Sequence, residues 1–194
     1  VELVDSTVDA NPGGGAMFLG NGRIERSALV NNIASAGHGG AGEYLHVELL
    51  DSTMSGNFSP ATGGMFANSA IIDGSTIVGN DTSDTFDTGG VFLLELSVMR
   101  NSILANNHAG AVLDNCAANP NGIASLGHNL TDGNGVDCML SAATDRLLTN
   151  PLLGALADNG GPTRTLLPQP GSPAIDGGDP SSCSASDQRG HPRP

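Results

Sequence analysis

The sequence lacks lysine and tryptophan, has a single tyrosine, and contains no long apolar run. Its basic residues are seven arginines, and the formal net charge at pH 7 is -13. This charge disfavours a nucleic acid as partner, because phosphate binding needs a basic patch on the protein. No stretch approaches the roughly 20 apolar residues that span a bilayer, so we expect no transmembrane segment in this chain.

Turn-forming residues are abundant. The chain has 28 glycines among 194 residues, and asparagine and aspartate are frequent. Hydrophobic residues make up 38%, which is too many for a disordered chain. The length suits one domain. The sequence shows no signal peptide and does not begin with Met, so we expect it to be a processed piece of a longer protein.

A six-residue pattern recurs along the chain. Its first residue is Ser, and its second is Thr or an aliphatic residue. An apolar residue, two variable residues and Asn complete the pattern. Its copies start at Ser6, Ser27, Ser52, Ser75 and Ser102 and end at Asn11, Asn32, Asn57, Asn80 and Asn107. Successive copies begin 21, 25, 23 and 27 residues apart. Five copies in phase indicate a repeat architecture, in which each repeat buries its apolar side chains only by stacking on its neighbours.

A second motif lies between these copies. A Gly-Gly or Gly-Ala pair followed by an apolar residue and Phe occurs at residues 15–18, 63–66 and 89–92. The apolar runs are short and bounded by Gly, Asn and Asp, which is typical of strands and turns and not of amphipathic helices. A coil of this length with two or three short strands fits one rung of a parallel β-helix. We expect three of the Phe residues, Phe18, Phe66 and Phe92, in the core.

Stacked rungs lie about 4.8 Å apart, so equivalent residues form columns along the axis. We expect an inward aliphatic column of Val8, Leu29, Met54, Ile77 and Ile103. We expect the five Asn residues that end the copies to form a turn ladder, in which side-chain amides pair with neighbouring backbone and with each other. The loops after these Asn residues vary in length and should protrude from one edge.

The glycine-apolar motif resembles the β-helix repeat of polymorphic outer membrane proteins. The segments 150–154, 157–163, 171–179 and 187–190 are similar to the choice-of-anchor family of bacterial surface proteins. That resemblance implies a block that closes a right-handed β-helix ahead of a cell-surface anchor, and hence a secreted or cell-surface location. We therefore predict an all-β, right-handed parallel β-helix of about six irregular rungs over residues 1–145. Residues 146–194 are predicted to be the closing segment of the same domain.

Three cysteines occur, Cys116, Cys138 and Cys183. The first two are separated by about one rung, which places them on neighbouring coils within reach of a disulfide. Such a bridge fits an exported protein; the alternative is three buried free thiols. Cys183 is then left either free or paired with a segment outside this sequence.

No catalytic constellation is evident. A Gly-His-Gly at His38 matches a short motif of polygalacturonase-like enzymes, but the clustered Asp residues and the basic residue that they require are absent. Arg100 is a candidate base for a lyase of this fold, and an ordinary surface arginine is the alternative. The histidines show no zinc-binding spacing. We therefore expect no enzymatic activity.

Calcium is the one cofactor that the sequence leaves open. Asp132, Asn134 and Asp137 supply three oxygen side chains in six residues, and a second acidic loop carries Asp81, Asp84 and Asp87. Calcium binds six to eight oxygen ligands, and acidic glycine-rich loops can supply them. The alternative in both places is a solvated acidic turn.

N-glycosylation sequons occur at Asn57, Asn80 and Asn129. Glycosylation needs outward-pointing side chains, whereas Asn57 and Asn80 occupy the ladder position.

The predicted function is a non-enzymatic extracellular structural module, either a rigid stalk, an adhesin-like scaffold or a fibre subunit. The alternative is a carbohydrate-binding or polysaccharide-degrading β-helix. A cell-surface glycan is one candidate partner. Head-to-tail self-assembly is another, because the sequence begins inside its first recognisable rung and uncapped strand edges recruit further strands. The alternative is that N-terminal residues outside this sequence supply the cap.

Overall fold

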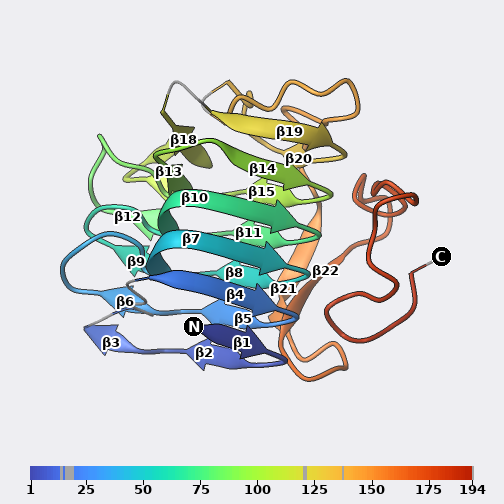
Figure 1. Ribbon diagram of the computed structural model, residues 1–194, viewed down its shortest axis with the longest axis horizontal. Helices are drawn as coiled ribbons and strands as arrows, with labels where there is room; N and C mark the ends of the chain where they lie inside the picture. Colours follow the sequence, from blue (N-terminus) through green and yellow to red (C-terminus); the bar gives the residue numbers. More distant parts are fainter. Residues whose placement is uncertain (14, 16–19, 120–121, 137, 194) are drawn as a thin grey trace.

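The computed structural model describes residues 1–13, 15, 20–119, 122–136 and 138–193. In this part of the chain, strands, turns and loops wind into a parallel β-helix of about five turns, and no helix occurs (Figure 1). The predicted all-β class and parallel β-helix are confirmed. The number of turns is slightly smaller than the six expected, because the last pass of the chain contributes strands to two of the three sheets.

Three sheets form the walls of the β-helix, and neighbouring rungs pair in parallel register. The first sheet contains β1 (Glu2–Val4), β4 (Asn21–Glu25), β7 (Gly42–Leu50), β10 (Met65–Asp73), β13 (Val91–Leu93), β14 (Ser97–Arg100), β18 (Cys116–Ala118) and β19 (Ile123–Gly127). The second contains β2 (Thr7–Asp9), β5 (Ala28–Val30), β8 (Thr53–Ser55), β11 (Thr76–Val78), β15 (Ile103–Ala105) and β20 (Leu130–Thr131).

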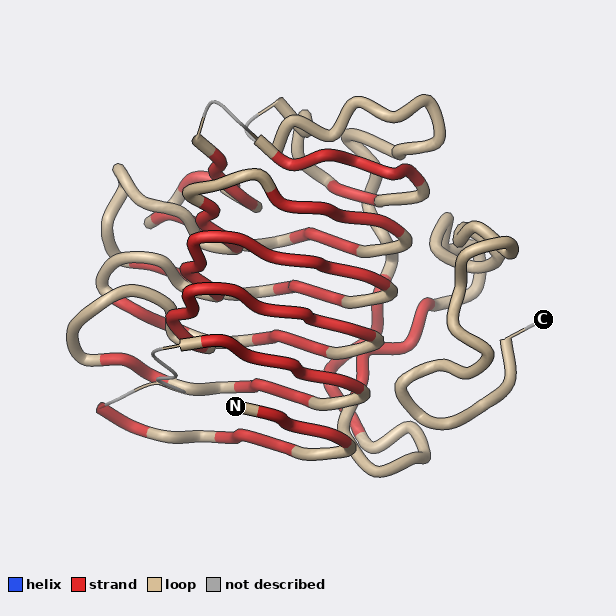
Figure 2. Tube along the Cα trace, in the orientation of Figure 1, coloured by secondary structure: helices blue, strands red, loops and turns tan. Residues whose placement is uncertain are grey.

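The third sheet contains β3 (Pro12–Gly13), β6 (Ile33–Ala34), β9 (Phe58–Ser59), β12 (Asp81–Thr82), β16 (His108–Ala109) and β17 (Val112–Leu113). Its last pair, β16 and β17, is antiparallel, which ends the parallel stack at that edge. The loops that follow β6, β9 and β12 extend beyond the strands on one side, as the variable spacing after each Asn predicts (Figure 2).

The corner between the first and second sheets is made by one residue in the left-handed backbone region. This residue is Asp5, Arg26, Asp51, Gly74, Asn101 or His128 in successive rungs. The corner after the second sheet is made in the same way by Ala10, Asn31, Gly56, Gly79 and Asn106. Gly, Asn and Asp adopt this conformation with the least strain, which explains their frequency in the sequence. In all five copies of the six-residue pattern, one of these left-handed residues directly precedes the Ser that begins the copy. Another directly precedes the Asn that ends it.

The inward column of the second sheet contains Leu29, Met54 and Ile77, all fully buried. Val8 is half-buried and packs against the same core. The prediction of Ile103 in this column is wrong, because Leu104 pairs in register with Ile77 and is fully buried, whereas Ile103 is half-exposed. Two adjacent aliphatic residues occupy this copy of the repeat, and the alternation of a strand turns only the second of them inward.

The turn asparagines form a continuous hydrogen-bonded column. The Oδ1 atom of Asn57 accepts hydrogen bonds from the backbone N–H and the Nδ2 of Asn32, at 3.0 and 2.9 Å. The Nδ2 of Asn57 donates to the Oδ1 of Asn80 at 2.8 Å and to the Leu29 carbonyl at 2.9 Å. The same pattern runs from Asn11 to Asn107. Each buried amide in the middle of this Asn ladder is therefore satisfied by both neighbouring rungs.

A serine column lies at the preceding corner. The backbone N–H of Ser27 donates to Ser52 Oγ at 3.1 Å, and that of Ser52 donates to Ser75 Oγ at 3.1 Å. Each hydroxyl in turn donates to a carbonyl two residues earlier, as Ser52 does to Leu50. Asn129 takes the serine position in the last rung and accepts from the Ser102 N–H. This Ser ladder joins the rungs at a second corner.

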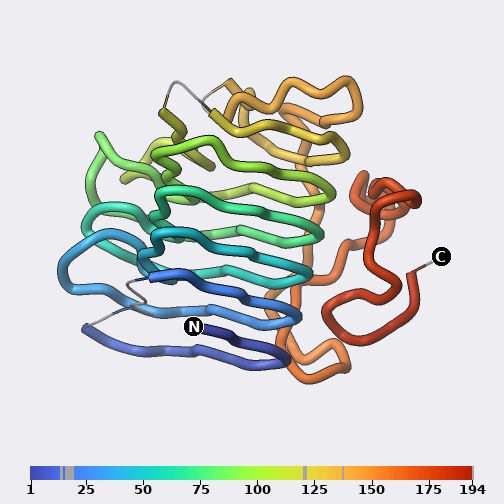
Figure 3. Tube along the Cα trace, viewed as in Figure 1, coloured from blue at the N-terminus to red at the C-terminus, as the bar shows by residue number. Residues whose placement is uncertain are grey.

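The closing segment lies along the side of the β-helix. After the last rung the chain runs back past the earlier rungs and forms the antiparallel pair β21 (Leu153–Ala157) and β22 (Thr165–Pro168) (Figure 3). We call residues 150–193 the strap. The buried amide of Gln188 bonds to the Thr53 hydroxyl, the Ser27 carbonyl and the Thr163 hydroxyl. One side chain of the strap therefore spans two neighbouring rungs.

Ion pairs add further attachments between the strap and the rungs. Arg164 pairs with Asp9 at 2.5 Å, and Arg193 pairs with Asp51 at 2.5 Å. Near the other end, the backbone N–H of Asp179 donates to Asn101 at 2.8 Å. Together these contacts reach from the first rung to the fifth.

We expect Asn57→Ala to lower the free energy of unfolding by about 3–5 kcal/mol. The change leaves buried groups on Asn32, Asn80 and the Leu29 carbonyl without a partner, and each such group costs about 1–3 kcal/mol. The matched control is Asn11→Ala, at the exposed end of the same ladder, for which we expect a loss of about 1 kcal/mol or less. Urea unfolding followed by circular dichroism measures both, and equal losses would contradict a ladder that carries stability.

Candidate functional site

The glycine-apolar motif produces an outward aromatic column on the first sheet. In β10 and β13, Met65 and Val91 point inward and are fully buried, so the adjacent Phe66 and Phe92 point outward and are half-exposed. The expectation that these Phe residues belong to the core is therefore wrong, because the alternation of a strand places neighbours on opposite faces. Phe18, expected in the core with them, lies outside the described residues.

The outward rings stack along the axis of the β-helix. Phe66 and Phe92 are paired in register, with ring centroids 5.6 Å apart and an interplanar angle of 14°. The ring of His38 lies 4.7 Å from that of Phe66, at an angle of 31°. Such pairs contribute about 0.5–1.5 kcal/mol each. The histidine of the Gly-His-Gly motif therefore takes part in an aromatic stack.

A hollow of about 320 Å³ lies at the end of this stack, and we call it the Phe92 hollow. Its apolar lining includes Phe92, Phe86 and Ala117. Its carboxylates are Asp87 and Asp114. Phe86 belongs to the loop between β12 and β13, and 98% of its surface is exposed. Aromatic faces beside carboxylates form a surface that recognises ligands.

Short hydrogen bonds position the loop that carries Phe86. The Thr82 hydroxyl accepts from the Asp84 N–H at 3.1 Å, and the Asp84 carboxylate accepts from the Phe86 N–H at 2.9 Å. The Asp87 carboxylate accepts from the Thr62 hydroxyl at 3.0 Å and from the Thr88 N–H at 2.9 Å. The loop is thus tied to β12 and to the preceding rung while its aromatic ring projects outward.

A second hollow, of about 180 Å³, lies beside Phe66, the central ring of the stack, and is also lined by Tyr44, Leu45 and Glu43. Tyr44 is buried beneath it and donates a hydrogen bond to the Ala41 carbonyl. Burial raises the pKa of the Tyr44 hydroxyl. The tyrosine is therefore a neutral part of the core wall.

A third hollow, of about 180 Å³, lies between the strap and the second sheet. His128 bonds to the Gly177 carbonyl at 3.0 Å, and Arg146 donates to the Pro173 carbonyl. Burial raises the pKa of the Cys183 thiol, which keeps it protonated and poorly nucleophilic. The polar groups around this hollow hold the strap in place.

Arg100, the candidate base, is paired with the Asp73 carboxylate at 2.7 Å.

The acidic segments do not converge on a common centre. Asp132 accepts a hydrogen bond from Asn115 at 2.7 Å, and Asp137 lies outside the described residues. Asp81 lies near His108 at 3.5 Å, and Asp84 and Asp87 bond to their own loop. In the part of the chain that the structure describes, no group of three or more His, Cys, Asp or Glu side chains is placed to hold a metal ion.

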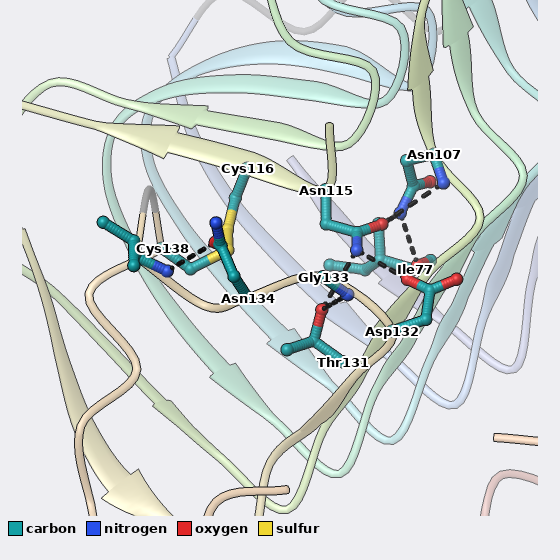
Figure 4. Close-up of a disulfide and its surroundings, with 10 residues drawn as sticks. Ile77, Asn107, Asn115, Cys116, Thr131, Asp132, Gly133, Asn134 and Cys138 are labelled. Carbon is teal, nitrogen blue, oxygen red and sulfur yellow. Dashed lines mark hydrogen bonds between the residues drawn. A yellow bond between two sulfur atoms is a disulfide. The ribbon is translucent and has the colours of Figure 1, made fainter. Parts of the chain in front are cut away.

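A disulfide joins Cys116 and Cys138, as their one-rung spacing predicts, and their Cα atoms are 5.3 Å apart. Figure 4 shows that it lies beside the end of the Asn ladder. There Asn107 bonds to Asn115, and Asn115 bonds to Thr131 and Asp132. The bridge therefore fixes the chain where the ladder ends. Cys183 is free.

The sequon asparagines are structural. Asn57, Asn80 and Asn129 are all buried, and their side chains bond to neighbouring rungs. A glycan could not be attached without removing these contacts.

The sequence did not predict three ladder or anchoring residues, Asn115, Asn129 and Gln188. None of them lies in a copy of the six-residue pattern.

No protein-family model, no curated protein and no solved structure matches the chain. Among the described residues, no helix is long and apolar enough to cross a membrane.

Two adjacent residues test the orientation of the aromatic column. We expect Leu93→Ala to cost about 2–5 kcal/mol of stability, because Leu93 is fully buried in the core. Phe92→Ala should cost about 1 kcal/mol, because it removes one outward ring contact. Chemical denaturation of the two variants gives both values. A greater loss for Phe92→Ala would place that ring in the core after all.

Proposed function

We propose that the chain is a rigid extracellular structural module of a secreted or surface-anchored bacterial protein. The observation that carries this proposal is the pair of continuous hydrogen-bond ladders, held together along the side by the strap. In the described part of the chain, no buried side-chain nitrogen or oxygen lacks a hydrogen-bond partner. A β-helix whose interior polar groups are bonded between rungs resists bending and opening.

Three features support the extracellular location. The disulfide between Cys116 and Cys138 is the kind of crosslink that oxidising compartments maintain. A net charge of -13 keeps a protein soluble and separate from anionic surfaces. The strap contains the segments that resemble the closing block of choice-of-anchor surface proteins, and it lies along the side of this β-helix. We propose the polymorphic outer membrane protein type of repeat on the separate resemblance of the glycine-apolar motif.

We expect antibodies against the purified protein to label intact cells of the organism that produces it. A stalk or scaffold acts outside the cell and is therefore accessible without permeabilisation. Immunogold electron microscopy gives the location and shows whether the label lies on stalks or fibres, with an antibody against a cytoplasmic protein as the control. Labelling that needs permeabilised cells would contradict the proposal.

A carbohydrate-binding function is the second candidate. It is favoured by the outward positions of Phe66, Phe92 and Phe86, since exposed aromatic rings stack on sugar faces. The stack runs along the axis of the β-helix, across neighbouring rungs. A cell-surface glycan is the partner that this surface would take.

We expect a glycan screen to detect binding without turnover, if the aromatic column is the recognition surface. Phe66→Ala should weaken binding, because it removes the central ring of the stack, whereas Phe58→Ala on the third sheet should not. Pectin and alginate serve as substrates in a parallel assay for released sugar. Turnover that disappears in His38→Ala or Arg100→Ala would replace this interpretation with an enzymatic one.

Head-to-tail self-assembly stays a proposal, and the two ends of the β-helix differ in what they offer it. Strands β1, β2 and β3 are the first members of their sheets among the described residues, and either a preceding segment of the protein or a second copy would pair there. At the other end, Asp145 closes the Ser ladder and Asp132 closes the Asn ladder. The closed end favours a single stalk over a filament made by strand pairing.

A further inference from the structure

We propose that the Phe92 hollow binds the side chain of a lysine presented by a partner polypeptide. The hollow is formed by Phe86, Asp87, Phe92, Asp114 and Ala117 together with neighbouring residues, and its volume is about 320 Å³. This volume lies at the small end of the range for ligand pockets. It suits one alkylammonium group and its aliphatic stem.

The Phe92 ring lines the hollow and stacks on Phe66 of the preceding rung. The next residue of the same column is Ala117, which pairs in register with Phe92. A methyl group is too small to cover a phenyl ring, so the aromatic stack ends here. The free face of a phenyl ring carries negative electrostatic potential and attracts a cation.

Phe86 adds a second ring that the fold leaves uncovered. Its side chain is 98% exposed, although the backbone of the loop is held by Asp84 and Asp87. A large apolar side chain on an ordered loop beside a hollow is placed to cover a ligand there. The hollow thus has aromatic surfaces from β13 and from the loop before it.

The charges around the hollow select a cation. Among the described residues that line it, the charged side chains are Asp87 and Asp114, and neither arginine nor histidine occurs. The chain as a whole carries a net charge of -13 and contains no lysine of its own that could compete for the site. An anionic ligand is therefore repelled, and an ammonium group is attracted by both carboxylates and rings.

The apolar floor distinguishes a lysine from an amino sugar. Ala117, which pairs in register with Phe92 and shares its outward face, supplies a methyl group to the lining. A lysine places a flexible methylene stem on such a surface and extends its charge to the carboxylates. An amino sugar instead brings several hydroxyl groups that need hydrogen-bond partners. The lining thus offers apolar surface for the stem of a lysine and carboxylates for its ammonium group.

The probe is n-butylammonium, which has the stem and charge of a lysine side chain, and n-butanol is its neutral counterpart. We expect n-butylammonium to shift the amide resonances of residues 85–92 and 114–118 in NMR titrations of the intact chain, and n-butanol to have little effect. Phe86→Ala should weaken the affinity roughly threefold to tenfold, because a cation–ring contact is lost. Folding should persist, since the Phe86 ring is almost fully exposed.

Charge variants complete the test. Asp87→Asn and Asp114→Asn should each weaken binding, and added salt should weaken it further. Glu95→Gln is the matched control, since it removes an exposed carboxylate that does not line the hollow. A lysine-containing peptide should bind at the same residues more tightly than a glucosamine oligomer of equal charge.

Four results would overturn the proposal. Equal binding of n-butanol would show a merely apolar pocket, and an equal effect of Glu95→Gln would show nonspecific attraction to an acidic surface. Preference for the glucosamine oligomer, or for neutral glucose oligomers, would assign the hollow to a glycan. The absence of any shift near Phe92 with n-butylammonium would leave no site. The structural role proposed above is independent of all four, because it is tested by location and not by ligand binding.

Discussion

The corners of the rungs are the constraint on which the structure depends. A chain that turns sharply and stacks on itself buries the amide and carbonyl groups of every turn, and each buried group must find a partner. One left-handed residue followed by Ser or Asn solves this problem, because the side chain bonds to the neighbouring rung. The strands between corners then align, and the alternation of Met65 and Phe66 or Val91 and Phe92 follows from that register. The corners do not constrain the length of the loops, which can therefore differ between rungs, as in the loop that carries Phe86.

Much of this architecture could be predicted from the sequence, because the corner chemistry is local and repeats in phase. The spacing of Ser and Asn predicted the parallel stack, and one-rung spacing predicted the disulfide. The facing of the residues in the glycine-apolar motif could not be read in the same way. Met65 and Phe66 are both hydrophobic, and only pairing with the strands of other rungs decides which of them points inward. The choice of Ile103 was instead an error of phase, because Leu104 is the third residue of its copy, as Met54 and Ile77 are of theirs. The strap lacks a period, so nothing in its composition predicted that Gln188 would be buried.

The repeated strands and the variable loops contribute different parts of the candidate site. The repeat supplies an ordered row of rings, since a motif that places an apolar residue inward also places its Phe outward. The loop supplies what varies from rung to rung, here Phe86 and Asp87. Neither part was evident from the sequence, because an outward Phe in a strand has the same local signature as a core Phe. A regular scaffold therefore presents a specific surface where one rung replaces Phe with Ala117 and the stack ends.

The direction of the asparagine bonds has an electrical consequence. One N–H of each Nδ2 in the column donates to the next amide toward the C-terminus, and each Oδ1 accepts from the preceding one, so the bonds between amides all run the same way. The second N–H of the inner amides donates back to a carbonyl of the preceding rung. Aligned dipoles polarise one another, and they sum to a partial positive charge at the C-terminal end, as in an α-helix at its N-terminus. The carboxylate of Asp132 accepts from the last amide at that end, as Asp145 does for Asn129 in the neighbouring column. The β-helix thus carries an axial macrodipole that is neutralised by its own aspartates, and its two ends are electrically different although the rungs between them are alike.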